Sequence, residues 1–238
     1  MSAARTQQKV SSELTGPVED YLKAIYELER SGEPAETNAI ARLLEIAPAS
    51  VSGMMRRLSE LHLITHERYR GARLTTVGRR AALKTLRRHR VIEAYLTSAL
   101  GYSWDLVHDE AERLEHAASD ELIDRMAEAI GEPATDPHGA PIPTREGRLD
   151  EPTLVPLASL ELGKTARVER VSDRSAERLR YLAELGIVPG VDVRVVAREP
   201  FEGPIALQVH NARRTVGPSL ASQILVTLVP AKRSHSTR

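Results

Sequence analysis

The segment 107–121, VHDEAERLEHAASDE, holds two histidines and six acidic residues, and its pattern predicts a helix. On a helix, positions three or four apart share a face. His108, Glu112, Glu115 and His116 are separated by four, three and one positions, so they form one stripe of imidazole and carboxylate groups. Like charges at this spacing repel one another. The stripe therefore either faces water or holds something positive.

A second pair of the same kind lies upstream. His89 and Glu93 are four positions apart in a segment that also has helical spacing. A single His–Glu pair would be interpreted as a solvated surface charge, but two helices that each carry one favour a divalent cation. Imidazole and carboxylate together bind Mn²⁺, Fe²⁺, Co²⁺ or Zn²⁺, and carboxylate-rich sites suit the harder ions. The chain has no cysteine, so no thiolate takes part.

An enzymatic metal centre is the main alternative to a binding site. The sequence has neither the His-Glu-x-x-His pattern of zinc proteases nor the Glu-x-x-His motif of di-iron bundles, and it lacks a glycine-rich phosphate-binding loop. A hydrolytic centre stays open, because nothing in the residues forbids one. A binding role is favoured, because nothing besides the metal requires catalysis.

Charge is strongly segregated along the chain, although 33 basic and 33 acidic residues balance. Residues 1–90 carry 16 Lys and Arg against 10 Asp and Glu, and 11 of these basic residues lie in 46–90. Residues 91–151 carry 4 against 15, and residues 152–238 carry 13 against 8. This suggests one anionic and one cationic partner. No run of apolar residues predicts a membrane span, and residues 1–16 lack the apolar core of a signal peptide. We therefore expect a cytoplasmic protein with no membrane partner.

The elements that must position these groups begin with three short helices. Helical spacing predicts helices over 16–32, 36–46 and 47–64. An alternating segment follows and turns at Arg70-Gly71, which predicts a hairpin. Helix, short helix, helix and hairpin is the order of a winged helix-turn-helix, whose recognition helix enters the major groove of DNA.

The third helix and the hairpin supply the residues that we expect to contact double-stranded DNA. Ser50 and Ser52, near the start of the helix, are expected to contact base edges or phosphates. Four arginines of the helix and the wing are expected to hold phosphates: Arg56, Arg57, Arg70 and Arg73. Alternatively, the hairpin only closes a small helical domain and the arginines are solvated. The order of elements and the charge together favour DNA binding.

The rest of the chain divides into helices, a proline-rich segment and strands. Helices are predicted over 76–100, after Trp104-Asp105, and over 119–130. Residues 131–156 hold six of the fourteen prolines, which indicates a linker. Short alternating segments follow, with one inserted helix, and they predict a small antiparallel barrel.

Taken together, these segments resemble the diphtheria toxin repressor and manganese transport regulator (DtxR/MntR) family of metal-dependent transcription factors. Residues 18–29, VEDYLKAIYELE, resemble the first helix of the family, and 50–80 resemble its recognition helix and wing. Residues 86–96, LRRHRVIEAYL, and 107–121 resemble its two metal-binding helices. Residues 180–196, RYLAELGIVPGVDVRVV, are similar to its C-terminal SH3-like, FeoA-type domain. The resemblance covers nearly the whole chain.

The resemblance implies a primary metal site made of Asp20, Glu112, Glu115 and His116. Asp20 and Glu112 stand where iron-responsive members have methionine and cysteine, and where manganese-responsive members have aspartate and glutamate. Two carboxylates in place of thioether and thiolate make a harder site, as Mn²⁺ prefers. Lys23 stands where the shorter manganese regulators have a glutamate, so their binuclear arrangement is not expected.

An ancillary site is also implied, with His89, Glu93 and His108 as its ligands. Asp173, in the C-terminal domain, lies near the position from which that domain supplies a further ligand. The implied fold is mainly α with small β parts. The expected divisions are a flexible N-terminal arm (1–16), a winged helix-turn-helix domain (17–76), a helical metal-binding and dimerisation domain (77–132), a proline-rich linker (133–156), an SH3-like, FeoA-type β-barrel (157–232) and a tail (233–238).

The implied function is a manganese-dependent repressor of genes for metal uptake and homeostasis. Metal binding would promote operator binding by a homodimer, with Fe²⁺ or Co²⁺ as alternatives to Mn²⁺. Three other interpretations stay open: an iron-responsive regulator of the same family, a metal-dependent hydrolase fused to a winged helix, and a metal-independent winged-helix regulator with a solvated acidic face.

Overall fold

The computed structural model describes residues 14–67 and 71–229. The chain folds into two compact units. Unit 1 comprises Met1–His89, Glu112–Ile123 and Ile142–Asp150. Unit 2 comprises Arg90–Ala111, Asp124–Pro141 and Glu151–Arg238. In the described part of the chain, no helix has the length and apolar character that a membrane crossing requires.

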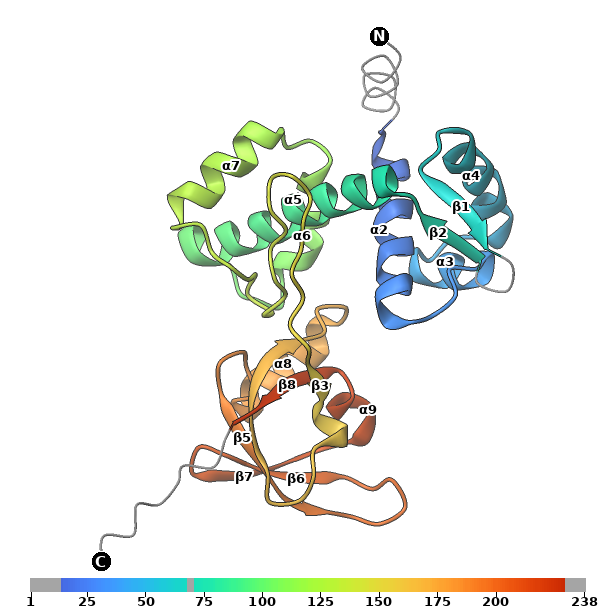
Figure 1. The fold of residues 1–238 in the computed structure, drawn as a ribbon. Coiled ribbons are helices and arrows are strands. Elements are labelled where there is room, and N and C mark those ends of the chain that lie inside the picture. The colour runs from blue at the N-terminus through green and yellow to red at the C-terminus, as the bar shows by residue number, and fades with distance from the viewer. Residues whose placement is uncertain (1–13, 68–70, 230–238) are drawn as a thin grey trace, which may run out of the picture. The chain divides into compact units, whose positions relative to one another are not determined.

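Unit 1 begins with a helix-turn-helix and its wing (Figure 1). Its elements are α2 (Gly16–Ser31), α3 (Thr37–Leu43), α4 (Pro48–Glu60), β1 (Ile64–Glu67) and β2 (Gly71–Leu74). The two strands pair antiparallel, from Ile64 opposite Leu74 to Glu67 opposite Gly71. The three predicted helices and the hairpin are confirmed.

The sequence pattern explains how this unit is held together. Proline occupies the first turn of both α2 and α4, where its missing N–H is not needed. Gly32 ends α2 in the left-handed conformation, and its N–H bonds back to the last turn. The apolar faces meet in one core that contains Leu22, Ile25, Ile40 and Leu58. These contacts fix the direction in which α2 and α4 present their polar faces.

Three further helices carry the acidic segment. They are α5 (Thr76–Leu100), α6 (Val107–Glu115) and α7 (Asp120–Ala129). The first and third lie close to the predicted ranges, but the single helix predicted over 107–121 is wrong beyond Glu115, because a turn separates α6 from α7. Helix α6 ends at Glu115, so His116 lies in the turn that follows rather than on the helix itself. The boundary between the two units falls between His89 and Arg90, in the middle of the continuous helix α5.

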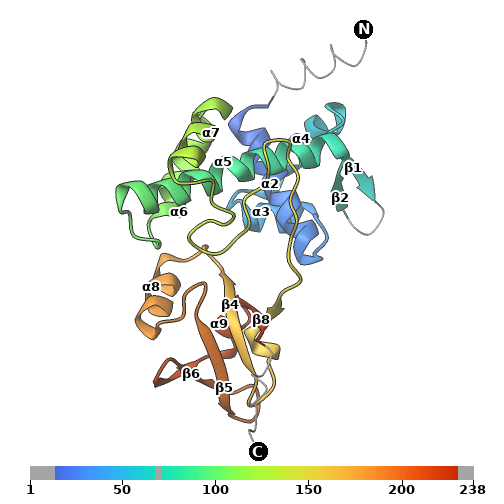
Figure 2. The same cartoon turned by 60° about the vertical axis from the view of Figure 1, so that its left-hand side comes forward.

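The C-terminal part of unit 2 is an antiparallel sheet of six strands around an apolar core (Figures 1 and 2). Its strand order is β3-β8-β4-β5-β6-β7. The strands are β3 (Val155–Pro156), β4 (Thr165–Val171), β5 (Asp192–Arg198), β6 (Ile205–Val209), β7 (Ala212–Val216) and β8 (Ile224–Leu228). Helix α8 (Ala176–Leu185) connects β4 to β5, as predicted, and a 3-10 turn η1 (Leu157–Ser159) and a short helix α9 (Pro218–Ala221) complete the domain.

The predicted SH3-like domain is observed, but its strands form a sheet that does not close into the expected barrel. Within residues 14–67 and 71–229, the strands β3 and β7 form the two edges of the sheet, so the sheet is not closed. Strand β3 has only two residues, and one of them is Pro156, which has no N–H to donate. Such a strand pairs with β8 but offers little backbone to a second neighbour. The domain is therefore an SH3-like open sheet.

Candidate metal centre

Unit 1 brings together three of the four residues expected at the primary site. One ligand atom from each of Asp20, Glu115 and His116 lies within 4.8 Å of the other two. Nε2 of His116 is 2.8 Å from Oδ1 of Asp20 and 3.6 Å from Oε1 of Glu115. Asp20 comes from α2 of the helix-turn-helix, whereas Glu115 is the last residue of α6 and His116 lies in the turn that follows. The group therefore joins the DNA-binding helices to the acidic segment.

The orientation of His116 is fixed from its other side by Glu19. Oε2 of Glu19 accepts a hydrogen bond from Nδ1 of His116 at 2.8 Å, and its other oxygen is paired with Arg88. A carboxylate on one ring nitrogen directs the other nitrogen toward a ligand. Burial lowers the pKa of His116, but the hydrogen bond to Glu19 and the charges of Asp20 and Glu115 outweigh it, so the pKa lies above its ordinary value. The spacing of the sequence did not indicate a role for Glu19, although it directly precedes Asp20.

Lys23 lies one turn after Asp20 on α2 and contacts the acidic stripe. Its Nζ is 2.8 Å from Oε1 of Glu115 and 3.5 Å from Oε1 of Glu112. Burial lowers the pKa of Lys23, but the charge and hydrogen bond of Glu115 hold it above its ordinary value. Glu112, the fourth residue expected at the primary site, is not in the three-residue group, and its side chain is 53% exposed.

Glu115 is the buried centre of this arrangement, with a side chain only 1% exposed. While Oε1 faces Lys23, Oε2 accepts a hydrogen bond from Nδ1 of His89 at 2.6 Å. Burial raises the pKa of Glu115, but His89 and Lys23 more than offset it and keep the pKa below its ordinary value. The carboxylate is therefore held in its charged form, ready to act as a ligand.

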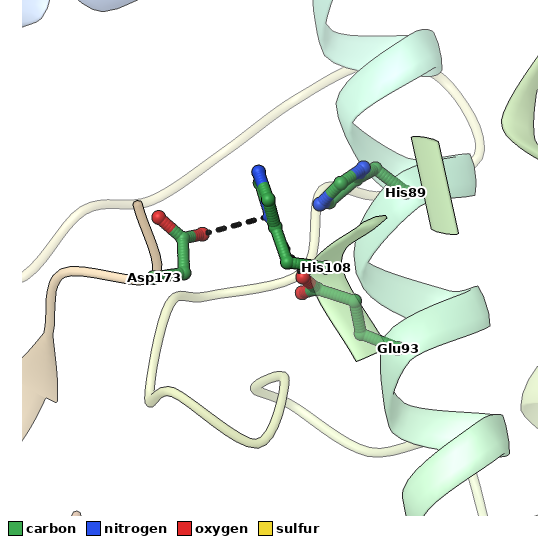
Figure 3. Close-up of side chains that lie close together, drawn as sticks. All are labelled: His89, Glu93, His108 and Asp173. Carbon is green, nitrogen blue, oxygen red and sulfur yellow. Dashed lines mark hydrogen bonds and ion pairs between the residues drawn. The ribbon is translucent and has the colours of Figure 1, made fainter. Parts of the chain in front are cut away.

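Unit 2 brings together three of the four residues expected at the ancillary site. Glu93, His108 and Asp173 come together in unit 2, and His89 lies one turn before Glu93 on the same helix. Figure 3 shows His108 between Asp173 and the two side chains of α5. Nδ1 of His108 is 3.3 Å from Oε1 of Glu93 and 3.7 Å from Oδ2 of Asp173. Asp173, which spacing alone could not place, lies at the group.

A third group, which no spacing in the sequence indicated, shares Glu93. The ligand atoms of Glu93, Asp136 and His138 lie within 4.8 Å of one another, and all three residues are buried. Nδ1 of His138 is 3.6 Å from Oε2 of Glu93, while its Nε2 donates to the carbonyl of Trp104. Burial alone would lower the pKa of His138, but Glu93 and Asp136 raise it to about 9. Burial and the charge of Glu93 raise the pKa of Asp136 to about 6.

A tight turn holds Asp136 and His138 against the sheet of unit 2. Oδ1 of Asp136 accepts hydrogen bonds from the backbone N–H groups of His138 and Ala140. The carbonyl of His138 accepts a bond from the N–H of Val171 in β4. A Cβ on Gly139, which has φ of 86°, would lie 1.8 Å from the carbonyl oxygen of Glu169. Only glycine fits this approach of the turn to the strand.

Five of the six residues predicted to contact DNA lie within the described part of the chain. Ser50, Ser52 and Arg56 are exposed on α4, and Arg57 is half-buried. In the wing strand β2, Nε of Arg73 lies 3.8 Å from Oε1 of Glu29 in α2. Arg70, the remaining predicted contact, lies outside the described residues.

The donor sets are suited to divalent metal ions. The three groups offer imidazole nitrogens, which suit ions such as Fe²⁺ and Zn²⁺, and carboxylate oxygens, which suit harder ions such as Mn²⁺. The partners that orient His116 and His89 are carboxylates, as is usual for ligating histidines. A helix-turn-helix whose first helix contributes a side chain to such a group is typical of one class: DNA-binding proteins that respond to a metal.

Comparison with known proteins agrees with this class along nearly the whole chain. Residues 13–72 match the family model described as "Iron dependent repressor, N-terminal DNA binding domain". Residues 75–144 match "Iron dependent repressor, metal binding and dimerisation domain", and residues 155–228 match "FeoA domain". The chain belongs to the iron-dependent repressor family, which includes the diphtheria toxin repressor.

Individual relatives show how far the similarity extends. The chain is 39% identical to a diphtheria toxin repressor of Corynebacterium jeikeium over 131 residues, 55% of each chain. It is 32% identical to the iron-dependent repressor IdeR of Mycobacterium leprae over 77% of this chain and 85% of that protein. A solved manganese-dependent transcriptional repressor in complex with manganese shares 38% identity and a TM-score of 0.84, covering 89% of this chain and all of that one. The chain is thus a metal-dependent transcriptional repressor and not an enzyme, with manganese and iron regulators among its relatives.

Proposed function

We propose that this protein is a manganese-responsive repressor that binds operator DNA as a homodimer and controls genes of metal uptake and homeostasis. The observation that carries the proposal is the Asp20–Glu115–His116 group, because it joins the first helix of the DNA-binding domain to the acidic segment. An ion held there would fix α2 relative to the end of α6. Metal and DNA would then tighten each other's binding, since linkage between two sites is reciprocal.

The chemistry of the ligands supports Mn²⁺ as the regulatory ion. Asp20, Glu115 and His116 would hold it, and Glu112 would join them by moving away from Lys23. None of the four offers sulfur, and the chain has no cysteine, so the site is harder than one with thiolate or thioether ligands. His89, Glu93, His108 and Asp173 would hold a second ion at the ancillary site.

The DNA-binding role of this chain is assigned to the exposed start of α4 and to the wing. Ser50 and Ser52 would contact base edges or phosphates, and Arg56, Arg57, Arg70 and Arg73 would hold phosphates. Symmetric operators are bound by dimers whose recognition helices lie about 34 Å apart. Large apolar side chains exposed in the helical segment support a homodimer: Leu100, Leu106, Leu114 and Leu122.

An iron-responsive repressor is the second candidate. The observation that favours it is the 32% identity to the iron-dependent repressor IdeR. The two candidates differ only in the ion that drives DNA binding in the cytoplasm. The ligand set described above favours Mn²⁺, because iron-responsive members of the family have methionine and cysteine where this chain has Asp20 and Glu112.

One titration tests both the proposal and the alternative. The full-length chain is titrated against genomic DNA fragments with chelator, with Mn²⁺, and with Fe²⁺ under anaerobic conditions. We expect specific binding with Mn²⁺ and its loss on chelation. Stronger activation by Fe²⁺ than by Mn²⁺ would identify an iron regulator instead, and unchanged operator binding after chelation would refute metal control altogether.

A further inference from the structure

We propose that Glu29 is the positioning residue that fixes the wing to α2, so that a movement of α2 at the metal site is carried to the DNA. The inference rests on the proposed function, because it takes the wing as a DNA contact and Asp20 as a metal ligand. Glu29 itself would touch neither the metal nor the DNA.

The carboxylate of Glu29 contacts the segment that leads from the wing into α5. Its Oε1 accepts a hydrogen bond from the backbone N–H of Leu74, the last residue of β2, at 2.8 Å. The same oxygen lies 3.8 Å from Nε of Arg73. Its Oε2 accepts a hydrogen bond from Nη2 of Arg79 in α5 at 2.5 Å. Because the side chain of Glu29 is only 10% exposed, these protein groups replace water around the charge.

Strand β2 lies against α2 (Figure 1) and is held at both of its ends. At its start, the N–H of Ala72 donates to the carbonyl of Ala35 at 3.0 Å, and a Cβ on Gly71 would lie 2.4 Å from the same oxygen. At its end, Glu29 holds Leu74. In the described residues, the sheet of the wing has two strands of four residues each. A two-stranded hairpin is only marginally stable by itself, so the orientation of the wing depends on these attachments.

Helix α2 connects the attachment of the wing to the metal group. It is a continuous helix of 16 residues, in which Asp20 and Glu29 are separated by about 13 Å along the axis. Both ends of α2 are paired with α5, through Glu19 with Arg88 and through Glu29 with Arg79. An ion at Asp20 that moved α2 would therefore move β2 with it.

The contact with Arg73 connects the attachment to the proposed DNA interface. The side chain of Arg73 is 41% exposed, so its guanidinium can approach a phosphate while Nε stays near Glu29. A side chain that is already oriented loses less conformational entropy when it binds. Glu29 therefore prepares Arg73 for its contact as well as fixing the strand that carries it.

The experiment compares two substitutions of Glu29 in the full-length chain. Glu29→Ala removes the contacts with Leu74, Arg73 and Arg79. Glu29→Gln keeps an oxygen that can accept the hydrogen bond from Leu74 and removes the charge. Glu33→Ala is the matched control, because it removes one negative charge from an exposed position shortly after α2.

Two DNA probes and one measurement without DNA are used. The affinity for a duplex of random sequence is measured at several salt concentrations, since phosphate contacts do not depend on sequence. The affinity for the genomic fragment selected in the Mn²⁺ titration is measured with Mn²⁺ and with chelator. Hydrogen exchange of the Leu74 amide is measured without DNA, and circular dichroism verifies that each variant is folded.

Glu29→Ala should bind the random duplex about tenfold more weakly, and its salt slope should fall by about one, as for the loss of one phosphate contact. Glu29→Gln should show an intermediate loss, and it decides the question if Glu29→Ala is not folded. In an Arg73→Ala background, Glu29→Ala should have little further effect, because both changes remove the same contact. The Leu74 amide should exchange faster in Glu29→Ala. A general loss of stability would change neither the salt slope nor the additivity.

The response to metal should change as well. The gain in affinity for the genomic fragment on addition of Mn²⁺ should be smaller in Glu29→Ala than in Glu33→Ala, because the wing no longer follows α2. The two sites are then less strongly coupled.

Three results would each overturn the inference. They are a wild-type salt slope in the folded Glu29 variants, losses of affinity that add fully when Glu29→Ala and Arg73→Ala are combined, and a gain on addition of Mn²⁺ that equals that of Glu33→Ala. Failure of the proposed function gives a different pattern. A wild-type chain whose DNA affinity does not respond to Mn²⁺ would refute metal control, whereas faster exchange at Leu74 in Glu29→Ala would still show that Glu29 holds the wing.

Discussion

Nδ1 of His89 donates a hydrogen bond to Oε2 of Glu115 at 2.6 Å, and this contact links two candidate metal groups. Glu115 belongs to the primary group with Asp20 and His116, whereas His89 belongs to the ancillary group. With Nδ1 committed to Glu115, the histidine presents Nε2 as its ligand atom. In the proposed sites, one buried carboxylate would thus have two roles, as a ligand in one group and as the orienting partner of a ligand in the other.

Glu115→Gln should therefore weaken metal binding more than Glu112→Gln. The amide keeps the shape of the side chain but removes the charge that faces both Lys23 and the metal position. We expect Mn²⁺ affinity to fall by about 100-fold or more for Glu115→Gln, since even supporting residues contribute about 10- to 100-fold. Calorimetric titration of both variants checks this. An equal loss of Mn²⁺ affinity in the two variants would show that the burial of Glu115 and its hydrogen bond to His89 do not contribute to metal binding.

Glu19→Gln should reduce metal affinity although Glu19 is not a proposed ligand. Its carboxylate orients His116 and is itself paired with Arg88. The loss expected for such a supporting partner is about 10- to 100-fold in metal affinity. Glu33→Gln, an exposed glutamate after α2, serves as the control. If the two variants bind Mn²⁺ equally well, the hydrogen bond to His116 has no part in metal binding.

The sequence predicted those features of the fold that depend on local spacing. The helical pattern placed α2 and α5 almost to the residue, because the period of 3.6 is visible in any helix with one buried face. The same spacing identified the pair His89 and Glu93, which lie on one helix. Alternation does not indicate strand β7, because its sequence ARRTV has few apolar residues and lies at an edge of the sheet.

The parts of the site that could not be predicted are long-range contacts. Lys23 and Glu115 are 92 positions apart, and Glu19 and His116 are 97 positions apart. No local pattern encodes such a pair, and Asp20 was identified only through the family resemblance. His138 lies in a proline-rich segment without periodicity, so nothing in the spacing indicated its burial.

Gly139→Ala should destabilise unit 2 by about 2 kcal/mol or more, because it combines backbone strain with a steric clash. The added Cβ would lie 1.8 Å from the carbonyl oxygen of Glu169. Gly163→Ala is the matched control, since Gly163 has φ of 80° but no heavy atom within 4 Å of the added Cβ. Urea denaturation compares the two. The prediction fails if both variants lose the same stability.

The pair Asp105–Arg180 should make the stability of unit 2 depend on pH. The hydrogen bond from Ser103 lowers the pKa of Asp105, and this effect outweighs burial, which raises it. Arg180 lowers the pKa further, because its Nη1 lies 2.9 Å from Oδ2 of Asp105. The unfolded group has an ordinary pKa of 3.8. Because the folded pKa is lower, the stabilisation is complete above this value and is lost as the pH falls through the folded pKa.

Asp105→Asn should remove that pH dependence. The variant should be less stable than wild type by about 1 kcal/mol at neutral pH, the size of a charge-assisted hydrogen bond with a partly exposed partner. The difference should shrink below about pH 4, as wild type gains its proton. Denaturation at a series of pH values measures it. A difference that grows toward acid would contradict the assigned direction of the shift.

The selectivity of the primary site should move when Glu112 is replaced by cysteine. Glu112→Cys exchanges a hard carboxylate for a softer thiolate and leaves Asp20, Glu115 and His116 in place. The thiolate favours later metals, so activation should shift from Mn²⁺ toward Fe²⁺, Co²⁺ or Zn²⁺. Stability should change little, because the Glu112 side chain is 53% exposed and contributes little to the core.

The measurement is the ratio of Mn²⁺ to Co²⁺ activation of DNA binding, determined side by side for wild type and Glu112→Cys. Asp109→Cys introduces the same thiol at an exposed position of α6 and corrects for non-specific metal binding. We expect the ratio to fall in Glu112→Cys and to stay unchanged in Asp109→Cys. An unchanged ratio in both variants would mean that Glu112 never leaves Lys23 to become a ligand. In that case the primary site consists of the three residues that the structure already brings together, Asp20, Glu115 and His116.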